Sequence, residues 1–332
     1  MRPIRTILVA VKNTRQKSSP AIAKATVLAR ALNARLELFH AISDPLAVDA
    51  LMFADMSVDK FEADERGRHL RRLDAIAEPL VRSGLEVGIS VEWDFPAHEA
   101  LIRRAHRTKA DLIVVERHVR RHIAPWFLRY TDWELLRRSP VPVLLVKSAR
   151  KYNSPTILAA VDPSHAFAKT TRLDQEILTI ASEFSVATNG QLHALHAYTP
   201  TIVGMKPAQL ILPDASATIS RRAEEFARTR LDGMLGKLRN VKVGPGRRHL
   251  IARHPVDAIP ELARQLGCDI VVMGALSRSG LKRFLIGNTA ERLLDDLPCD
   301  LLIVKPPAFA SRVPARSRGV QFVPLMSSEG HM

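Results

Sequence analysis

The chain has 332 residues, 46% hydrophobic and 25% charged, which suits a globular protein with two domains. Its 49 Lys and Arg against 34 Asp and Glu give a net charge of +15, but no helix-turn-helix, zinc-finger or RNA-recognition signature is present, so specific nucleic-acid binding is not expected. No apolar run is long enough to cross a bilayer, and an apolar strand begins close to the N-terminus; we expect a cytoplasmic protein without membrane contact.

Short apolar runs alternate with segments of helical periodicity along the first half of the chain. Runs rich in β-branched residues are typical of buried strands, and apolar residues three and four apart indicate helices. We expect strands over residues 6–12, 35–42, 85–93, 110–115 and 141–146, and helices over residues 20–32, 59–82, 96–107 and 132–138.

The pattern then starts again, with recognisably similar residues. The matching blocks are 6–11 with 156–161, 33–41 with 189–197, 111–115 with 269–273, and 139–147 with 297–305. Four blocks in the same order, at nearly constant separation, indicate a duplicated domain of about 150 residues.

Alternating strands and helices require parallel sheets with right-handed crossovers. The predicted fold class is therefore α/β, with two tandem, doubly wound, five-stranded parallel sheets of the Rossmann-like kind. We expect domains over residues 1–148 and 154–306, and a disordered tail over residues 307–332, which is rich in Pro, Ser, Arg and Gly. A ligand site should lie beyond the carboxyl ends of the strands.

One glycine-bearing stretch of the second repeat has the arrangement of a phosphate site. A predicted strand over residues 268–273 leads into Gly274, and Gly280 and Gly287 follow. Asn288 and Thr289 then precede a predicted helix start. Glycines let backbone N–H groups approach phosphate oxygens, and free N–H groups at a helix start face the anion. On these residues alone, a plain turn is the alternative.

This stretch resembles the nucleotide loop of universal stress proteins, whose pattern is Gly, two residues, Gly, nine residues, then Gly followed by Ser or Thr. Gly274 and Gly287 match the first and third positions, whereas Ser277 and Asn288 depart from the pattern, and Gly280 lies outside it.

The resemblance extends over about residues 3–306 and is greatest to the tandem, E-type members of bacteria, on residues 131–137 and 286–291. It implies two packed α/β domains, and a regulator of stress survival with no agreed chemical reaction.

Other residues of the second repeat extend this candidate site. Asp162 follows the first strand, where an acid accepts from a ribose or caps a helix. His196 and Ala197 end the second strand, where the resemblance implies backbone contacts to adenine, and Met273 covers a purine or belongs to the core. The predicted nucleotide-contacting residues are Ala160, Val161, Asp162, His196, Ala197, Met273, Gly274, Ser277, Arg278, Gly280, Gly287, Asn288 and Thr289.

The first repeat differs at the positions that matter for phosphate binding. Lys12 stands in place of Asp162, Glu116 in place of Gly274, Val119 in place of Ser277, and Arg129 in place of Gly287. Side chains would occupy the path of the phosphate, so we predict that this half binds no ATP. Its basic loop over residues 117–122 binds another anion or a partner, or is simply solvated.

Our leading hypothesis is a regulatory binding protein, not an enzyme, whose C-terminal domain takes ATP or a related phosphorylated ligand while its N-terminal domain is a scaffold. The alternatives are an interaction protein or an apolar-ligand binder that uses the interdomain groove, with residues 199–220 as a flap, and a weak ATPase. No catalytic residue and no metal site is predicted; Cys268 and Cys299 read as structural thiols of a reducing compartment. Unidentified protein partners are expected, and the chain is a monomeric pseudo-dimer or a homodimer.

Overall fold

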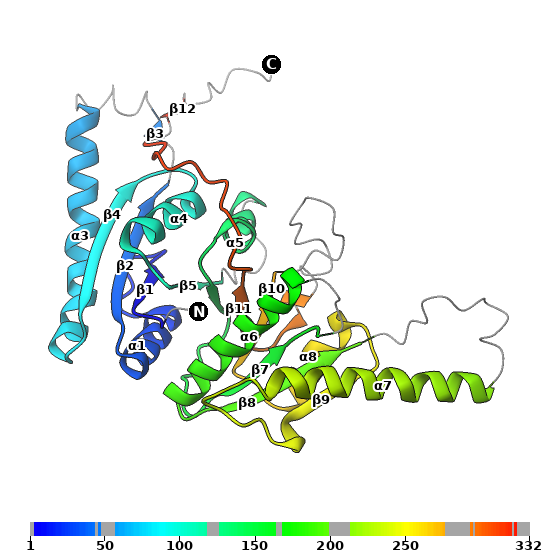
Figure 1. Cartoon of the computed structure of the whole chain (residues 1–332). Coiled ribbons are helices and arrows are strands. Elements are labelled where there is room, and N and C mark those ends of the chain that lie inside the picture. Colours follow the sequence, from blue (N-terminus) through cyan, green and yellow to red (C-terminus); the bar gives the residue numbers. More distant parts are fainter. Residues whose placement is uncertain are drawn as a thin grey trace, which may run out of the picture. The chain divides into compact units, whose positions relative to one another are not determined.

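The computed structural model describes residues 3–43, 46–47, 57–117, 126–163, 168–198, 213–275, 293–294, 296–320 and 322–323 (Figure 1). These residues form two compact units. The N-terminal unit comprises Pro3–Val143 together with the described residues from Ala310 onward, and the C-terminal unit comprises Leu144–Phe309. No helix among these residues is long and apolar enough to span a membrane.

The N-terminal unit has a parallel sheet in the order β4-β2-β1-β5. Helix α1 packs on β1, β2 and β5, α3 on β2 and β4, and α4 on β1 and β2. The strands are β1 (Thr6–Ala10), β2 (Arg35–Ile42), β4 (Val87–Trp93) and β5 (Leu112–Glu116), and the helices are α1 (Pro20–Leu32), α3 (Val58–Arg82), α4 (Ala97–Thr108) and α5 (Trp126–Arg138). A separate two-stranded parallel sheet joins β3 (Leu46–Ala47) to β12 (Phe322–Val323).

Local signals account for the ends of α1. The side chain of Ser19 accepts a hydrogen bond from the Ile22 amide at the start, where Pro20 needs no donor. The helix ends at Asn33, whose φ of 52° is the left-handed conformation that Asn tolerates. The chain can therefore turn at once into β2.

The C-terminal unit repeats this architecture. Its sheet has the order β6-β11-β10-β7-β8-β9, in which β11, β10, β7, β8 and β9 pair in parallel. The elements are β6 (Val143–Val146), β7 (Thr156–Ala160), α6 (Ala168–Ala187), β8 (Gln191–Ala197), α7 (Pro213–Leu235), the single 3₁₀ turn η2 (Pro245–Arg247), β9 (Arg248–Ile251), α8 (Pro255–Gln265), β10 (Ile270–Gly274) and β11 (Asp300–Val304).

In each repeat the third, second, first and fourth strands lie side by side in that order, which is the doubly wound arrangement. The predicted α/β fold class is confirmed. Two expectations need correction. Helix α5 begins at Trp126 and not near residue 132, and residues 213–220 of the expected flap belong to helix α7. The rest of that flap lies outside the described residues.

The segment after β6 is fixed within the C-terminal unit by one buried acid. Asp300, fully buried, accepts from the backbone amides of Lys147 at 2.9 Å and Ser148 at 3.1 Å, and from the Tyr152 hydroxyl at 2.5 Å. Burial, and then the charge of Asp300, raise the pKa of Tyr152 well above its usual value, so the hydroxyl remains a donor. The stretch between the two expected domains, residues 148–154, is thus partly built into this unit.

The expectation of a disordered tail over residues 307–332 is wrong for its first part. Arg318 of this segment donates from its backbone amide to Asp94 and from its guanidinium to Glu99, both in the N-terminal unit. Composition alone cannot reveal such a tail, because its order depends on buried carboxylates more than two hundred residues earlier in the chain.

Candidate functional site

The residues predicted at three strand ends of the second repeat are brought together by the sheet of the C-terminal unit. Ala160 at the end of β7 pairs with Leu195 of β8 on one side and with Met273 of β10 on the other. Val161 continues beyond β7, and its amide donates to the Leu195 carbonyl at 2.9 Å. Ala160, Val161, Asp162, His196, Ala197, Met273 and Gly274 therefore share one edge of the sheet. Ser277, Arg278, Gly280, Gly287, Asn288 and Thr289 lie outside the described residues.

Asp162 is a partly exposed acid at this edge. Its side chain is 29% exposed, and its Oδ1 lies 3.8 Å from Nδ1 of His196. His196 is fully buried, and the same nitrogen lies 3.3 Å from the Val161 carbonyl oxygen. The imidazole ring also stacks on Tyr198, with 5.8 Å between ring centroids. His196 is thus a packed, hydrogen-bonded residue that positions the strand end, while Asp162 can meet a ligand.

A second acid at this edge was not predicted from the sequence. Oδ1 of Asp174, on α6, accepts from the Asp162 amide at 3.1 Å. Burial, together with the nearby charge of Asp162, raises the pKa of Asp174 to about 7, although the hydrogen bond from the Asp162 amide opposes this shift. The available signal was an acid on an apolar helix face, because Asp174 is buried with Ile177, Leu178 and Ala181 at helical spacing.

Gly274 has a structural explanation that needs no ligand. A Cβ placed on this residue would lie 2.7 Å from Cδ2 of Leu173 and 3.3 Å from Cδ1 of Ile177, both on α6. The absent side chain thus permits close packing of α6 on β10. The sequence predicted open backbone at Gly274 beside a phosphate. Helix α6 covers this face of Gly274, so the backbone is not open on that side.

The corresponding strand end of the N-terminal unit keeps the histidine and loses the acid. Nδ1 of His40 lies 2.7 Å from the Val11 carbonyl oxygen, which matches the pair of His196 and Val161. Lys12, in the place of Asp162, forms an ion pair with Asp132 of α5 at 2.7 Å. An ammonium group with an internal partner thus stands where the other repeat presents a partly exposed carboxylate.

Helix α3 adds a second histidine to the N-terminal strand end. His69 stacks on His40 with ring centroids 4.3 Å apart, and its Nδ1 lies 2.8 Å from the Thr14 hydroxyl. Burial, and then the charge of His40, lower the pKa of His69 to about 4. Glu116 ends β5, and of the basic loop only Arg117 is described.

The thiols do not contribute to either strand end. Cys268 and Cys299 are free and buried, and burial raises the pKa of Cys268 to about 12, which disfavours its reactive thiolate form. Among the described residues, no cluster of His, Cys, Asp and Glu could hold a metal ion.

The fold defines a class of protein: tandem, doubly wound α/β domains with parallel strands. The family model of the universal stress protein family matches residues 3–147 and again residues 154–305. The chain therefore belongs to the universal stress protein family, as a tandem member.

Relatives of this family are similar along nearly their whole length. Universal stress protein E of Salmonella typhi is 27% identical over 314 residues, which cover 92% of this chain and 96% of that protein. Universal stress protein E of Escherichia coli K12 is 26% identical over the same shares. A solved protein of unknown function from Pseudomonas aeruginosa PAO1 superposes with a TM-score of 0.67 at 26% identity, covering 92% of this chain and 93% of its own.

Proposed function

We propose that this protein acts in the stress response by binding a ligand, and that the C-terminal unit takes an adenine nucleotide or a related phosphorylated molecule. The carboxylate of Asp162 carries the proposal. It is partly exposed at the carboxyl edge of the parallel sheet, where a ligand reaches the ends of β7, β8 and β10 together. Such a carboxylate accepts hydrogen bonds from ribose hydroxyls.

The difference between the repeats supports a single nucleotide site. At the matching position of the N-terminal unit, Lys12 is engaged by Asp132, so a ribose would meet a donor that already has a partner. Glu116, at the end of β5, adds a carboxylate that repels phosphate. We infer that the N-terminal unit does not take the nucleotide.

We propose binding and not catalysis. The sequence holds no Gly-Lys-Ser/Thr motif of the kind that cradles a transferred phosphate. The stress-response role rests on membership of the family, and the long E-type relatives bear that name. The cytoplasmic setting remains an expectation.

Calorimetric titration of the full chain with ATP and Mg²⁺ tests the proposal. We expect binding in the micromolar to millimolar range, weakened at least about tenfold by Asp162→Ala, because one ribose hydrogen bond to a carboxylate is worth about 1.5 kcal/mol or more. Lys12→Gln, the matched change in the N-terminal unit, should leave the affinity unchanged. Absence of heat and of a thermal shift at millimolar ATP contradicts the proposal. Equal loss in both variants would instead place the site elsewhere.

A further inference from the structure

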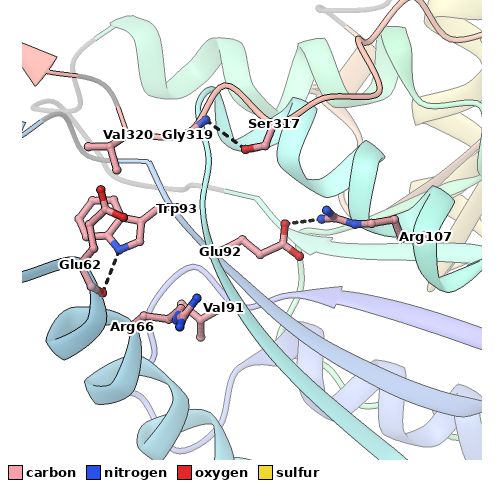
Figure 2. Close-up of a pocket in the computed structure, with 9 residues that line it drawn as sticks. All are labelled: Glu62, Arg66, Val91, Glu92, Trp93, Arg107, Ser317, Gly319 and Val320. Carbon is pink, nitrogen blue, oxygen red and sulfur yellow. Dashed lines mark hydrogen bonds and ion pairs between the residues drawn. The ribbon is translucent and has the colours of Figure 1, made fainter. Parts of the chain in front are cut away.

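The N-terminal unit contains a pocket at the carboxyl end of β4, next to the strand end described above, since Val91 pairs with His40. Its volume is about 480 Å³, and it lies between α3, the last residues of β4, and the C-terminal segment (Figure 2). Apolar surface comes from Val91, Trp93 and Val320. This unit was predicted to be a scaffold without a ligand, so the pocket is an unassigned feature.

The wall formed by the C-terminal segment is anchored by buried charges. Arg103, with a side chain only 3% exposed, donates to both oxygens of Asp94 at 2.8 Å and to the Pro314 carbonyl at 3.2 Å. Arg318 donates from Nε and Nη2 to the two oxygens of Glu99 at 3.0 and 3.1 Å. Charge-assisted, bidentate contacts of this kind hold a segment in one register.

Both arginines of this anchor also act on the pKa of Glu99. Burial alone would raise the pKa of Glu99, but hydrogen bonds from Arg318 and Arg103 outweigh burial and lower it. Glu99 is therefore ionised near neutral pH, and Arg318 is held. Ser317, Gly319 and Val320 follow from this anchor directly into the lining of the pocket.

Trp93, which lines the pocket, is held in place by contacts with α3. Its Nε1 donates to the Glu62 carbonyl at 3.3 Å, and its ring lies 6.4 Å from that of Phe61, measured between centroids. Figure 2 shows the indole beside Val320 on one side and α3 on the other. A fixed indole with its polar atom already satisfied offers a flat apolar surface to a ligand.

Two side chains of opposite charge, one helical turn apart on α3, remain without partners. The carboxylate of Glu62 and the guanidinium of Arg66 both line the pocket, yet neither forms an ion pair or side-chain hydrogen bond with another described residue. By contrast, the other acid and base of the lining, Glu92 and Arg107, are engaged, because Arg107 and Arg104 both form ion pairs with Glu92. The pocket therefore presents one available negative charge and one available positive charge beside an apolar floor.

We propose that this pocket binds an apolar α-amino acid, and that the C-terminal segment completes the site. The α-carboxylate would meet Arg66, the α-ammonium group would meet Glu62, and the side chain would lie on Trp93, Val91 and Val320. Side chains one turn apart on a helix lie close enough to meet the two adjacent charges of one zwitterion. The site is separate from the proposed nucleotide site, so either proposal can fail alone.

L-Phenylalanine is the probe, titrated by calorimetry into the full chain. We expect millimolar or tighter binding, and at least tenfold weaker binding of 3-phenylpropionate, which lacks the ammonium group, and of phenethylamine, which lacks the carboxylate. Arg66→Gln and Glu62→Gln should each weaken binding at least tenfold. Arg82→Gln, a change on the same helix at a side chain 71% exposed and outside the pocket, should not. Thermal melts establish that each variant is folded.

Several outcomes would overturn the proposal. Failure of L-phenylalanine to bind at millimolar concentration excludes the amino acid, and equal binding of the two analogues excludes recognition of a zwitterion. Unchanged affinity in Arg66→Gln moves the ligand out of this pocket. The part played by the C-terminal segment is tested by Arg318→Gln, which should weaken binding several-fold; no change would show that the segment is not part of the site. Asp162→Ala should have no effect on this binding.

Discussion

At the end of β7 the carboxylate of Asp162 lies partly exposed beside a buried histidine, whereas at the end of β1 the ammonium group of Lys12 is bound by Asp132. In both repeats a histidine of the second strand contacts the carbonyl of the residue that follows the first strand. Duplication has thus kept the frame and changed the charges. In the N-terminal repeat this position holds a cation that pairs with Asp132, and in the C-terminal repeat it holds a partly exposed acid.

Helices α4 and α8, which precede the fourth strand of each repeat, also differ in the burial of one matching position. Each helix is followed by a residue in the left-handed conformation, Lys109 with φ of 52° or Gly267 with φ of 59°. Counting back equally from these two residues shows that Arg103 and Glu261 occupy matching positions in the two repeats. Arg103 is buried among acids beneath the C-terminal segment, while the side chain of Glu261 is 45% exposed. The C-terminal segment contacts Arg103 through the Pro314 carbonyl.

The largest expected effect comes from breaking this contrast at Arg103. Arg103→Ala removes the guanidinium that pairs with Asp94, which is fully buried, and one partner of Glu99, so the free energy of unfolding should fall by about 3–5 kcal/mol. Glu261→Ala, its counterpart on α8, should change it by less than about 0.5 kcal/mol. Urea denaturation of both variants provides the measurement. Similar losses in the two variants would show that the C-terminal segment does not bury α4.

A pH experiment sharpens the comparison of the strand ends. Asp174 has a pKa near 7 in the folded protein against 3.8 when unfolded, so the folded state takes up a proton and its stability declines as the pH rises from about 4 to 7. Asp174→Asn removes this decline and keeps an acceptor for the Asp162 amide. We expect a gain in stability that grows between pH 4.5 and 7.5 to about 1–3 kcal/mol.

The control for this experiment is Glu225→Gln, on the exposed face of α7, which should give a difference that does not grow with pH. His69 and His98 have the opposite effect on stability, because burial chiefly lowers the pKa of each to about 4 in the folded protein. The free energy of unfolding therefore decreases as the pH falls from 6.5 towards 4. A constant offset between Asp174→Asn and the parent protein would mean that Asp174 is ionised throughout.

The sequence predicted what depends on local pattern and on repetition. Strand β2 and helix α1 have the bounds expected from apolar spacing, and a capping Ser and a turning Asn account for the ends of α1. It did not predict Asp174 as part of the site, because helical periodicity shows that a polar residue faces the core but not which strand end it meets. Nor did it predict the order of the segment around Arg318, since the acids that hold it are remote in the chain.

The smallest expected effect concerns Gly274, where packing and ligand access give different expectations. If α6 dictates the glycine, Gly274→Ala places a methyl group 2.7 Å from Cδ2 of Leu173, whose side chain is itself buried, and should cost about 1–2 kcal/mol. The loss should shrink when Leu173 is also shortened to Ala, which gives a favourable coupling in a double-mutant cycle. Glu116→Ala, at the matching end of β5, should cost less than about 0.5 kcal/mol. Should Gly274→Ala keep its stability but lose ATP binding, the glycine serves the ligand and not the helix, and the two strand ends differ for a reason other than packing.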